Sequence, residues 1–355
     1  MIEEATPKEK KTLLLLFDGH ALIHRAFHAL PPLTQSRTGE MVNAVYGFAS
    51  TLLKTLADFK PTYCAIAFDP PGPTFRHEMF HEYKAQRPAT PDELRGQMNK
   101  VRQLVEAFHI PIFEINGFEA DDVLGTLSRQ ASEQGVETII VTGDKDMFQV
   151  VLPLVKILTP RRTFSDTILY NEAAVEQKHG VKPEQIADLK ALAGDASDNI
   201  PGVPGIGEKT AARLIQQYGS IEQIYTHIDD VTPDKLQMAL REHRSQAFQS
   251  KTLATIVRDV PIELDLINCH VSHFDRDEVV KLFQELEFIN LLPRLPQEKA
   301  DNRQPPAVKY HLVNTSISLE QLITELEATQ DIAIEIETTG KEAISCSRDM
   351  LVFTR

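Results

Sequence analysis

Nine acidic residues stand at the ends of strand-like segments or in the turns that follow them. Carboxylates that are brought close together repel one another, so their pKa values rise unless a cation neutralises them. Hard divalent cations such as Mg²⁺ bind oxygen ligands and leave several coordination positions for water and phosphate. The pattern therefore indicates metal-assisted chemistry on a phosphate backbone. The nine residues are Asp18, Asp69, Glu119, Asp121, Asp122, Asp144, Asp146, Asp195 and Asp198.

Short apolar segments alternate with helical patterns in the first half of the chain, which predicts an α/β fold with a mostly parallel sheet. Continuous apolar runs of this length are typical of strands that are buried on both faces. Ligands of such sheets bind beyond the carboxyl ends of the strands, where we expect Asp18, Asp69 and Asp144 to meet. The predicted strands are Leu13–Phe17, Thr62–Phe68, Ile112–Ile115 and Thr138–Val141, and the predicted helices are Ala21–Ala29, Ala44–Asp58, Pro91–Phe108 and Asp121–Gln134.

Changes in composition divide the chain into four regions. Residues 12–182 carry the α/β pattern, and helical patterns dominate residues 183–292. Residues 293–308 are polar and rich in proline, which is typical of a linker. Residues 309–355 look like the opening of another α/β domain, which we expect to be incomplete.

The net charge of -14 disfavours generic binding to nucleic acid, which depends on Lys and Arg. Metal ions bound to an acidic cluster would invert the local sign, so the charge alone excludes no partner. The cysteines Cys64, Cys269 and Cys346 have neither disulfide nor zinc spacing and predict free thiols in a reducing cytoplasm. The sequence shows neither a secretory signal nor an apolar run that could cross a bilayer, so we expect a cytoplasmic protein without a membrane partner.

Each acidic motif has a structural alternative when it is taken alone. An Asp after a strand, such as Asp18 or Asp69, is often only the N-cap of the next helix. The acids of Glu119–Asp122 would also suit the positive end of a helix macrodipole. Asp195 and Asp198 lie three residues apart, so one turn of helix could present both. Together the motifs supply the carboxylates from separate segments that a two-metal site for phosphodiester hydrolysis needs, without a His or Cys cluster that would indicate zinc.

A glycine-rich segment, IPGVPGIGEKTA, connects the last acidic pair to a helix predicted over Thr210–Tyr218. Two of its glycines allow a tight hairpin whose backbone N–H groups point outward at a helix N-terminus, which is a natural phosphate seat. Contacts of this kind hold a duplex without reading its sequence. The alternative is a turn between two helices that binds nothing. The candidate DNA-binding residues are Gly202, Gly205, Gly207 and Lys209.

A basic segment that also carries aromatic residues follows Asp69. An exposed, charged helix face is the simple interpretation. Beside an anionic site, however, its cations could clamp a scissile phosphate, and its aromatic rings could stack on an unpaired base. The candidates are Arg76 and Tyr83 for DNA binding, and Lys84 and Arg87 for catalysis.

In these motifs the chain resembles the 5′-nuclease domain of bacterial DNA polymerase I, which is a member of the flap endonuclease family. The segments that carry the resemblance run in consistent order from about Thr12 to Asp265. They are FDGHALIHRAFHALPPL, AFDPPGPTFRHEMFHEYKAQRP, GFEADDVLGTL, TGDKDMFQVV and LAGDASDNIPGVPGIGEKTAARLI. The resemblance implies a Rossmann-like (PIN-like) nuclease core with a helical arch through which a 5′ single strand passes. It also implies an all-α helix–hairpin–helix region that grips the downstream duplex with K⁺.

The resemblance also assigns roles to individual residues. It places the nine acids on the family's ligands for two Mg²⁺ ions, with Mn²⁺ as a substitute. Lys84 and Arg87 fall on the arch cations that contact the scissile phosphate, and Gly202–Lys209 falls on the hairpin that grips the duplex. Residues 12–182 then form the nuclease core, and residues 183–292 form the DNA-binding region.

The last region, residues 309–355, resembles the start of a 3′→5′ proofreading exonuclease domain. Glu335 stands where an Asp-x-Glu metal motif has Asp, so that ligand is longer by one methylene. The other acids of a proofreading site and a polymerase domain are absent, and we therefore expect neither proofreading nor synthesis from this chain. The predicted elements are strands over Tyr310–Val313 and Ile332–Ile336 and a helix over Leu319–Ala328.

The function that the resemblance implies is a structure-selective 5′→3′ exonuclease and 5′-flap endonuclease. Its expected substrates are DNA with a flap, nick or gap, including RNA-primed strands, in Okazaki fragment processing and DNA repair. We expect a monomer in the bacterial cytoplasm, associated with the nucleoid. One alternative, a non-catalytic module that binds DNA junctions, predicts broken acidic motifs. Another, an RNA nuclease of the PIN class, suits the acids, but the hairpin and the basic segment favour DNA junctions.

Overall fold

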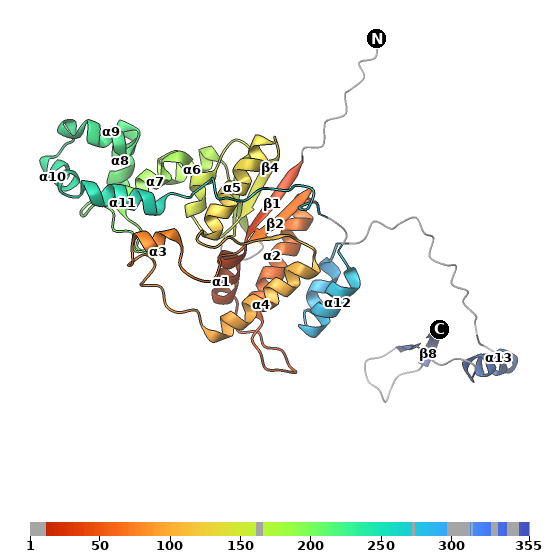
Figure 1. Ribbon diagram of the computed structural model, residues 1–355. Helices are drawn as coiled ribbons and strands as arrows, with labels where there is room; N and C mark the ends of the chain where they lie inside the picture. The colour runs from red at the N-terminus through yellow and green to blue at the C-terminus, as the bar shows by residue number, and fades with distance from the viewer. Residues whose placement is uncertain are drawn as a thin grey trace, which may run out of the picture. The chain divides into compact units, whose positions relative to one another are not determined.

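The apolar run near the start of the chain is the central strand of a six-stranded sheet. In this computed structural model, β1 (Leu13–Asp18) pairs in parallel with β2 (Tyr63–Ala67) and with β4 (Glu137–Val141). The strand order is β3-β2-β1-β4-β5-β6, and β6 runs antiparallel to β5. Figure 1 shows β2, β1 and β4 side by side at the centre of this sheet. The remaining strands of this sheet are β3 (Ile112–Phe113), β5 (Val155–Pro160) and β6 (Thr167–Tyr170).

The structure describes residues 12–160, 166–271, 274–296, 313, 315–327, 333–338 and 348–354. The chain divides into two compact units, Met1–Pro296 and Gln297–Arg355. The second unit contains α13 (Ser316–Glu327) and the antiparallel pair β7 (Ala333–Thr338) and β8 (Arg348–Thr354).

Helices cover both faces of the six-stranded sheet because the side chains of β1 alternate between two apolar clusters. Leu14 and Leu16 belong to the cluster that includes α5 (Ala120–Glu133). Leu15 and Phe17 belong to the opposite cluster, which includes residues of α1, α2, α4 and α12. These four helices are α1 (Gly19–Ala29), α2 (Asn43–Phe59), α4 (Asp92–Ala107) and α12 (Arg276–Glu285). A strand buried on both sides explains why the sequence of β1 is apolar throughout.

A helical region follows the sheet. In it α7 (Ile186–Ala193) packs against α8 (Glu208–Tyr218) and α11 (Arg244–Ala254), so the glycine-rich segment joins two packed helices. The other helices of the first unit are α3 (Phe75–Met79), α6 (Glu172–His179), α9 (Ile221–Thr226) and α10 (Asp234–Glu242). Short 3₁₀ turns span Asp146–Val150, Pro183–Gln185, Ile228–Asp230 and Ile289–Arg294.

The predicted α/β fold with a mostly parallel sheet is confirmed, and each predicted strand and helix of the first unit has a counterpart shifted by at most two residues at either end. The strands β5 and β6 and the short helix α3 were not predicted. In the second unit, a helix and a strand lie where we expected them, whereas Tyr310–Leu312 falls outside the described residues. The region boundaries at residues 182, 292 and 308 stay predictions. In the described part of the chain, no helix is both long and apolar enough to cross a membrane.

Shortening a buried side chain of β1 should lower stability far more than the same change at the edge of the sheet. Leu16→Ala leaves a cavity in the central strand, because Leu16 is fully buried, and should lower the free energy of unfolding by about 2–5 kcal/mol. Leu169→Ala in β6, where the side chain is 42% exposed, should lower it by less than about 1 kcal/mol. Urea unfolding of both variants measures the difference, and equal losses would contradict the assigned positions.

Candidate active site

The site begins where the strand order of the sheet reverses, at the carboxyl ends of β1 and β4. Ligands of open parallel sheets bind in the crevice at such a point. Asp18 ends β1, and its side chain caps α1 by accepting a hydrogen bond from the Ala21 N–H at 3.0 Å. Its other carboxylate oxygen accepts a 2.7 Å hydrogen bond from the Thr142 hydroxyl, which directly follows β4. Asp18 therefore serves as the N-cap of α1 and at the same time contacts Thr142 at the end of β4.

The loop after β4 turns two further acids towards Asp18. The Asp144 N–H donates to the Thr142 hydroxyl at 2.9 Å, and the Asp146 N–H donates to Asp144 Oδ1 at 2.8 Å. Burial raises the pKa of Asp18 to about 7. Hydrogen bonds from the Ala21 N–H and the Thr142 hydroxyl oppose this rise, and the negative charges of Asp69 and Asp144 add to it. This hydrogen-bonded chain thus holds acids from two strands close enough to repel one another.

The start of α5 joins the same cluster. The Ala120 N–H donates to Asp69 Oδ1 at 2.7 Å, so the residue after β2 is tied to the first turn of α5. Burial, Asp144 and Asp18 raise the pKa of Asp121 well above its usual range. Asp69 and Asp121 therefore lie within electrostatic reach of the Asp18 carboxylate, as the predicted sheet required.

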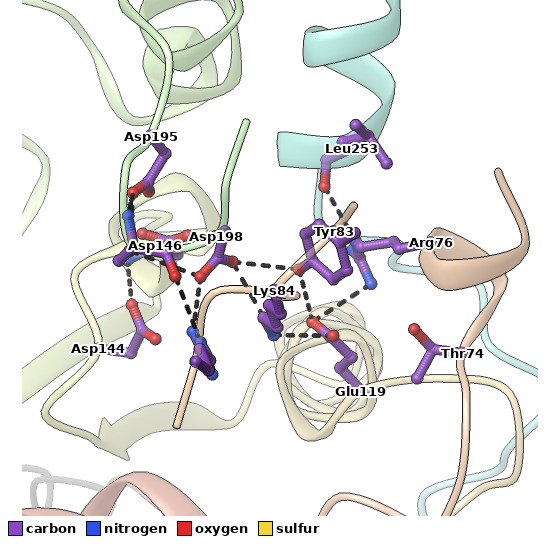
Figure 2. Close-up of polar contacts among 12 residues, drawn as sticks. Thr74, Arg76, Tyr83, Lys84, Glu119, Asp144, Asp146, Asp195, Asp198 and Leu253 are labelled. Atoms are coloured by element: carbon purple, nitrogen blue, oxygen red, sulfur yellow. Dashed lines mark hydrogen bonds and ion pairs between the residues drawn. The ribbon is translucent and has the colours of Figure 1, made fainter. Parts of the chain in front are cut away.

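The basic segment lies directly on the carboxylates. Lys84 Nζ is 2.8 Å from Glu119 Oε1 and 3.9 Å from Asp198 Oδ2, and Arg87 Nη2 is 2.5 Å from Asp198 Oδ1. The Tyr83 hydroxyl lies 3.2 Å from Glu119 Oε2 and 3.1 Å from Asp198 Oδ2. Figure 2 shows Lys84 between Glu119 and Asp198. The predicted catalytic cations and two of the predicted ligands are thus in direct contact.

A lysine that we did not predict joins the last two acids of the cluster. Lys190 of α7 forms ion pairs with Asp146 Oδ1 and with Asp195 Oδ2. Asp195 and Ile200 also exchange backbone hydrogen bonds, both 2.8 Å long, which close the loop that carries Asp195 and Asp198. The only sequence signal for Lys190 was its place five residues before Asp195, on a helix that leads into an acidic loop.

Asp122 differs from the other eight acids in that it forms a buried ion pair of its own. It is fully buried and forms a two-pronged pair with Arg76, with N–O distances of 2.7 and 2.8 Å. The N–H groups of Glu119 and Val257 donate to the same carboxylate. Both oxygens are therefore satisfied inside the protein, so the structure places Asp122 in a structural ion pair, whereas we had predicted a metal ligand.

The expected DNA contacts of Arg76 and Tyr83 also differ from the structure. Arg76 is 2% exposed and Tyr83 is 3% exposed, so neither side chain offers a surface to a base or a phosphate. Arg76 instead donates to the carbonyl oxygens of Leu253 and Thr255 at the end of α11. The segment expected to form a helical arch consists of the five-residue α3 and a series of turns before α4. It is anchored to the protein through Arg76.

The glycines of the hairpin fall into two kinds. Gly202 is buried at φ 62°, its N–H donates to the Ser250 hydroxyl at 3.2 Å, and a Cβ there would lie 2.2 Å from the backbone N of Gly194. Gly202 is therefore needed for close packing against the end of α7. Gly205, at φ 84°, is exposed, as are Gly207 and Lys209 at the start of α8. These three residues present the surface that a phosphate could reach.

The eight remaining acids form a donor set made only of oxygen, which suits a hard divalent cation. As the side chains lie, however, no three of the described His, Cys, Asp and Glu residues are arranged to hold a metal ion. The cationic side chains of Lys84, Arg87 and Lys190 contact the carboxylates instead. Burial, with a further contribution from Asp144, still raises the pKa of Asp146 to about 7, although Lys190 opposes the shift. The cluster therefore carries more negative charge than its side-chain cations neutralise.

The family is decided by two matches that follow each other along the chain. Residues 13–180 match the 5′-3′ exonuclease N-terminal resolvase-like domain, and residues 181–277 match the 5′-3′ exonuclease C-terminal SAM fold. The chain belongs to the 5′-3′ exonuclease family. The resemblance seen in the sequence is thereby confirmed, and the reaction class of this family is phosphodiester hydrolysis.

Known proteins resemble the chain over most of its length. DNA polymerase I of Bacillus caldotenax is 42% identical over 327 residues, which are 92% of this chain and 36% of the relative. The chain thus spans about a third of the length of the curated relatives that it matches. The 5′-exonuclease of bacteriophage T5 with bound zinc gives a TM-score of 0.57 at 23% identity. The T5 flap endonuclease in complex with DNA and metal ions gives 0.59 at 20% identity. Both alignments cover 78% of this chain and 99% of the other, and at this identity they show the fold.

The raised pKa of Asp18 predicts a pH dependence of stability. An acid whose pKa is higher in the folded state makes the free energy of unfolding fall as the pH rises from about 4 to about 7. Asp18→Asn removes this titration, so between those pH values the variant should gain on the order of 4 kcal/mol relative to the parent. Urea unfolding in EDTA measures the gain. Asp229→Asn, at an exposed ion pair with Arg241, is the control, and a difference independent of pH would contradict the prediction.

Proposed function

We propose that this chain is a structure-selective, Mg²⁺-dependent 5′ nuclease. Its substrates are 5′ flaps and the 5′ ends at nicks and gaps in duplex DNA, including RNA-primed strands. The observation that carries the proposal is the meeting of eight acids from separate segments at the carboxyl ends of β1 and β4. One lysine and one arginine from the segment after β2, Lys84 and Arg87, contact these acids. These two residues and the exposed glycine hairpin lie within residues 13–277, which match the two domains of the family.

Divalent metal ions fit the donor set, and we propose two Mg²⁺ ions with Mn²⁺ as a substitute. The T5 structures named above carry metal ions, zinc among them. Oxygen-only ligands favour Mg²⁺ over zinc in this chain. When bound, a pair of such ions would activate the attacking water and stabilise the leaving oxygen. We assign the ligand roles to Asp18, Asp69, Glu119, Asp121, Asp144, Asp146, Asp195 and Asp198.

Lys84 and Arg87 would hold the scissile phosphate against this edge of the sheet. Lys84 reaches both Glu119 and Asp198, so its ammonium lies between the acids that follow β3 and those that follow α7. Arg87 is half-exposed and can reach a ligand from the solvent side. Fixed cations at this place would stabilise the negative charge that develops on the phosphate oxygens.

The hairpin between α7 and α8 would grip the duplex beside the flap. Gly205, Gly207 and Lys209 are exposed, and backbone amides at a helix N-terminus bind phosphate without reading base sequence. We place K⁺ at this hairpin as a bridge to the DNA backbone. A nuclease of this kind would act as a monomer on RNA primers and displaced strands in Okazaki fragment processing and repair, at the nucleoid in the bacterial cytoplasm.

Replacing one carboxylate of the site should separate catalysis from folding. Asp195→Asn keeps the size of the side chain and its contact with Ser197 but removes a charge, and should lower the rate of 5′-flap cleavage by at least about 10–100-fold. The measurement is product mapping on a labelled double-flap DNA with Mg²⁺ and with EDTA. The exposed Asp229→Asn variant should cleave like the parent. Cleavage by Asp195→Asn at the parental rate would show that Asp195 has no part in catalysis.

The hairpin predicts a salt-dependent duplex contact. Lys209→Ala should weaken binding to a nicked duplex and reduce the slope of log affinity against log salt concentration by about 1, because one phosphate contact is lost. Fluorescence anisotropy in Ca²⁺ over a range of salt concentrations measures both. Lys235→Ala, at an exposed lysine of α10, is the matched control. An unchanged slope for Lys209→Ala would place the duplex elsewhere.

A further inference from the structure

One cation of the site differs from the others in where it comes from. Lys84 and Arg87 reach the carboxylates from the segment after β2, whereas Lys190 belongs to α7, the helix that leads into the hairpin. Its side chain is 15% exposed and lies against two acids that are themselves only 20% and 15% exposed. Figure 2 shows Asp146 and Asp195 on one side of the site, Glu119 on the other, and Asp198 between them.

The charge of Lys190 is strongly stabilised by this position. Its Nζ atom forms ion pairs with Asp146 Oδ1 and with Asp195 Oδ2, and all three side chains are at most 20% exposed. Asp195 Oδ1 also accepts hydrogen bonds from the Ser197 N–H at 2.8 Å and from the Ser197 hydroxyl at 2.7 Å. A single positive charge shared by two acids neutralises them incompletely.

We propose that Lys190 is a resident cation that holds Asp146 and Asp195 together and competes with a divalent ion for both carboxylates. The proposal rests on the function given above, because it takes these two acids as metal ligands. One ammonium carries half the charge of a divalent ion and fewer directed contacts, so the ion can displace it. The flexible four-carbon stem of lysine allows the ammonium to leave while α7 stays in place. Lys190 thereby sets the affinity of this half of the site for metal.

The competition also explains the arrangement of the acids. Lys190 draws Asp146 and Asp195 towards its own ammonium, and Arg87 draws Asp198 in the same way. Carboxylates that turn towards a side-chain cation are withdrawn from a shared metal position. Arg87 is half-exposed, whereas Lys190 is mostly buried against its two acids, so Lys190 is the less accessible of these two cations.

The test is a calorimetric titration of the full chain with Mn²⁺. Lys190→Met keeps the length and apolar stem of the side chain but removes the charge. We expect the weaker class of Mn²⁺ sites to bind at least about tenfold more tightly in the variant. In EDTA the variant should unfold at a lower urea concentration than the parent, and added Mn²⁺ should raise its midpoint more than that of the parent. Lys190→Arg keeps the charge, so its weaker Mn²⁺ sites should bind Mn²⁺ with the same affinity as those of the parent.

The chain offers a matched control on a neighbouring helix. Lys251 of α11 also bridges two acids, at 2.7 Å from Asp188 Oδ1 and 2.7 Å from Glu222 Oε1, outside the acidic cluster. Lys251→Met should lower stability in EDTA and leave Mn²⁺ binding as in the parent. If Lys190→Met does not fold, Lys190→Gln replaces it with the same expectation.

Two results would overturn the inference: Mn²⁺ binding by the uncharged Lys190 variants that equals the parent, or binding that is weaker. Flap cleavage by the parent with Mg²⁺ tests the proposed function separately. If the parent cleaves the flap and the variants bind Mn²⁺ as the parent does, only the role proposed for Lys190 is wrong. If the parent does not cleave the flap and Lys190→Met binds Mn²⁺ more tightly, the proposed nuclease function is wrong and the competition between Lys190 and metal stands.

Discussion

Repulsion among buried carboxylates is the constraint on which the rest of this structure depends. The sheet places acids from several segments at one edge, and the pKa values of Asp18 and Asp146 rise to about 7 because burial and neighbouring acids disfavour their charged forms. This repulsion is reduced by side-chain cations at three places and by hydrogen bonds from the Thr142 hydroxyl and from backbone N–H groups. A folded chain that stores this much negative charge loses stability unless something offsets it, which is the physical reason to expect divalent ions here.

The buried pair of Arg76 and Asp122 shows how the fold positions its exposed cations. Arg76 belongs to α3, Asp122 to α5, and the carbonyl groups that accept from Arg76 belong to the end of α11. A pair of this kind is a weak source of net stability, but removing one partner would leave a buried charge without compensation. Its main consequence is geometric. The segment that carries Lys84 is fastened to two helices eight residues before that lysine, so the ammonium can rest on Glu119.

The sequence was sufficient for the strands β1, β2, β3 and β4 and for most of the acidic cluster, because both follow from local patterns. The run Leu14–Phe17 is apolar throughout only if both faces are covered, and Asp18 must then lie at its carboxyl end. Side-chain partners that come from distant segments could not be predicted. Asp122 looks like its neighbour Asp121 in sequence, and only the fold brings Arg76 against it. For Lys190 the only signal was its place five residues before Asp195, which was too weak because a lysine on a short helix usually faces solvent.

The closed loop between α7 and the hairpin fixes the position of the hairpin relative to the acidic cluster. Backbone hydrogen bonds between Asp195 and Ile200 close the loop at its base, and Gly202 approaches Gly194 so closely that no side chain fits between the two chain segments. The hairpin and the loop that carries Asp195 and Asp198 are therefore one stiff unit. If the hairpin binds a duplex as proposed, the position of that duplex and the position of these two carboxylates are set by the same short stretch of backbone.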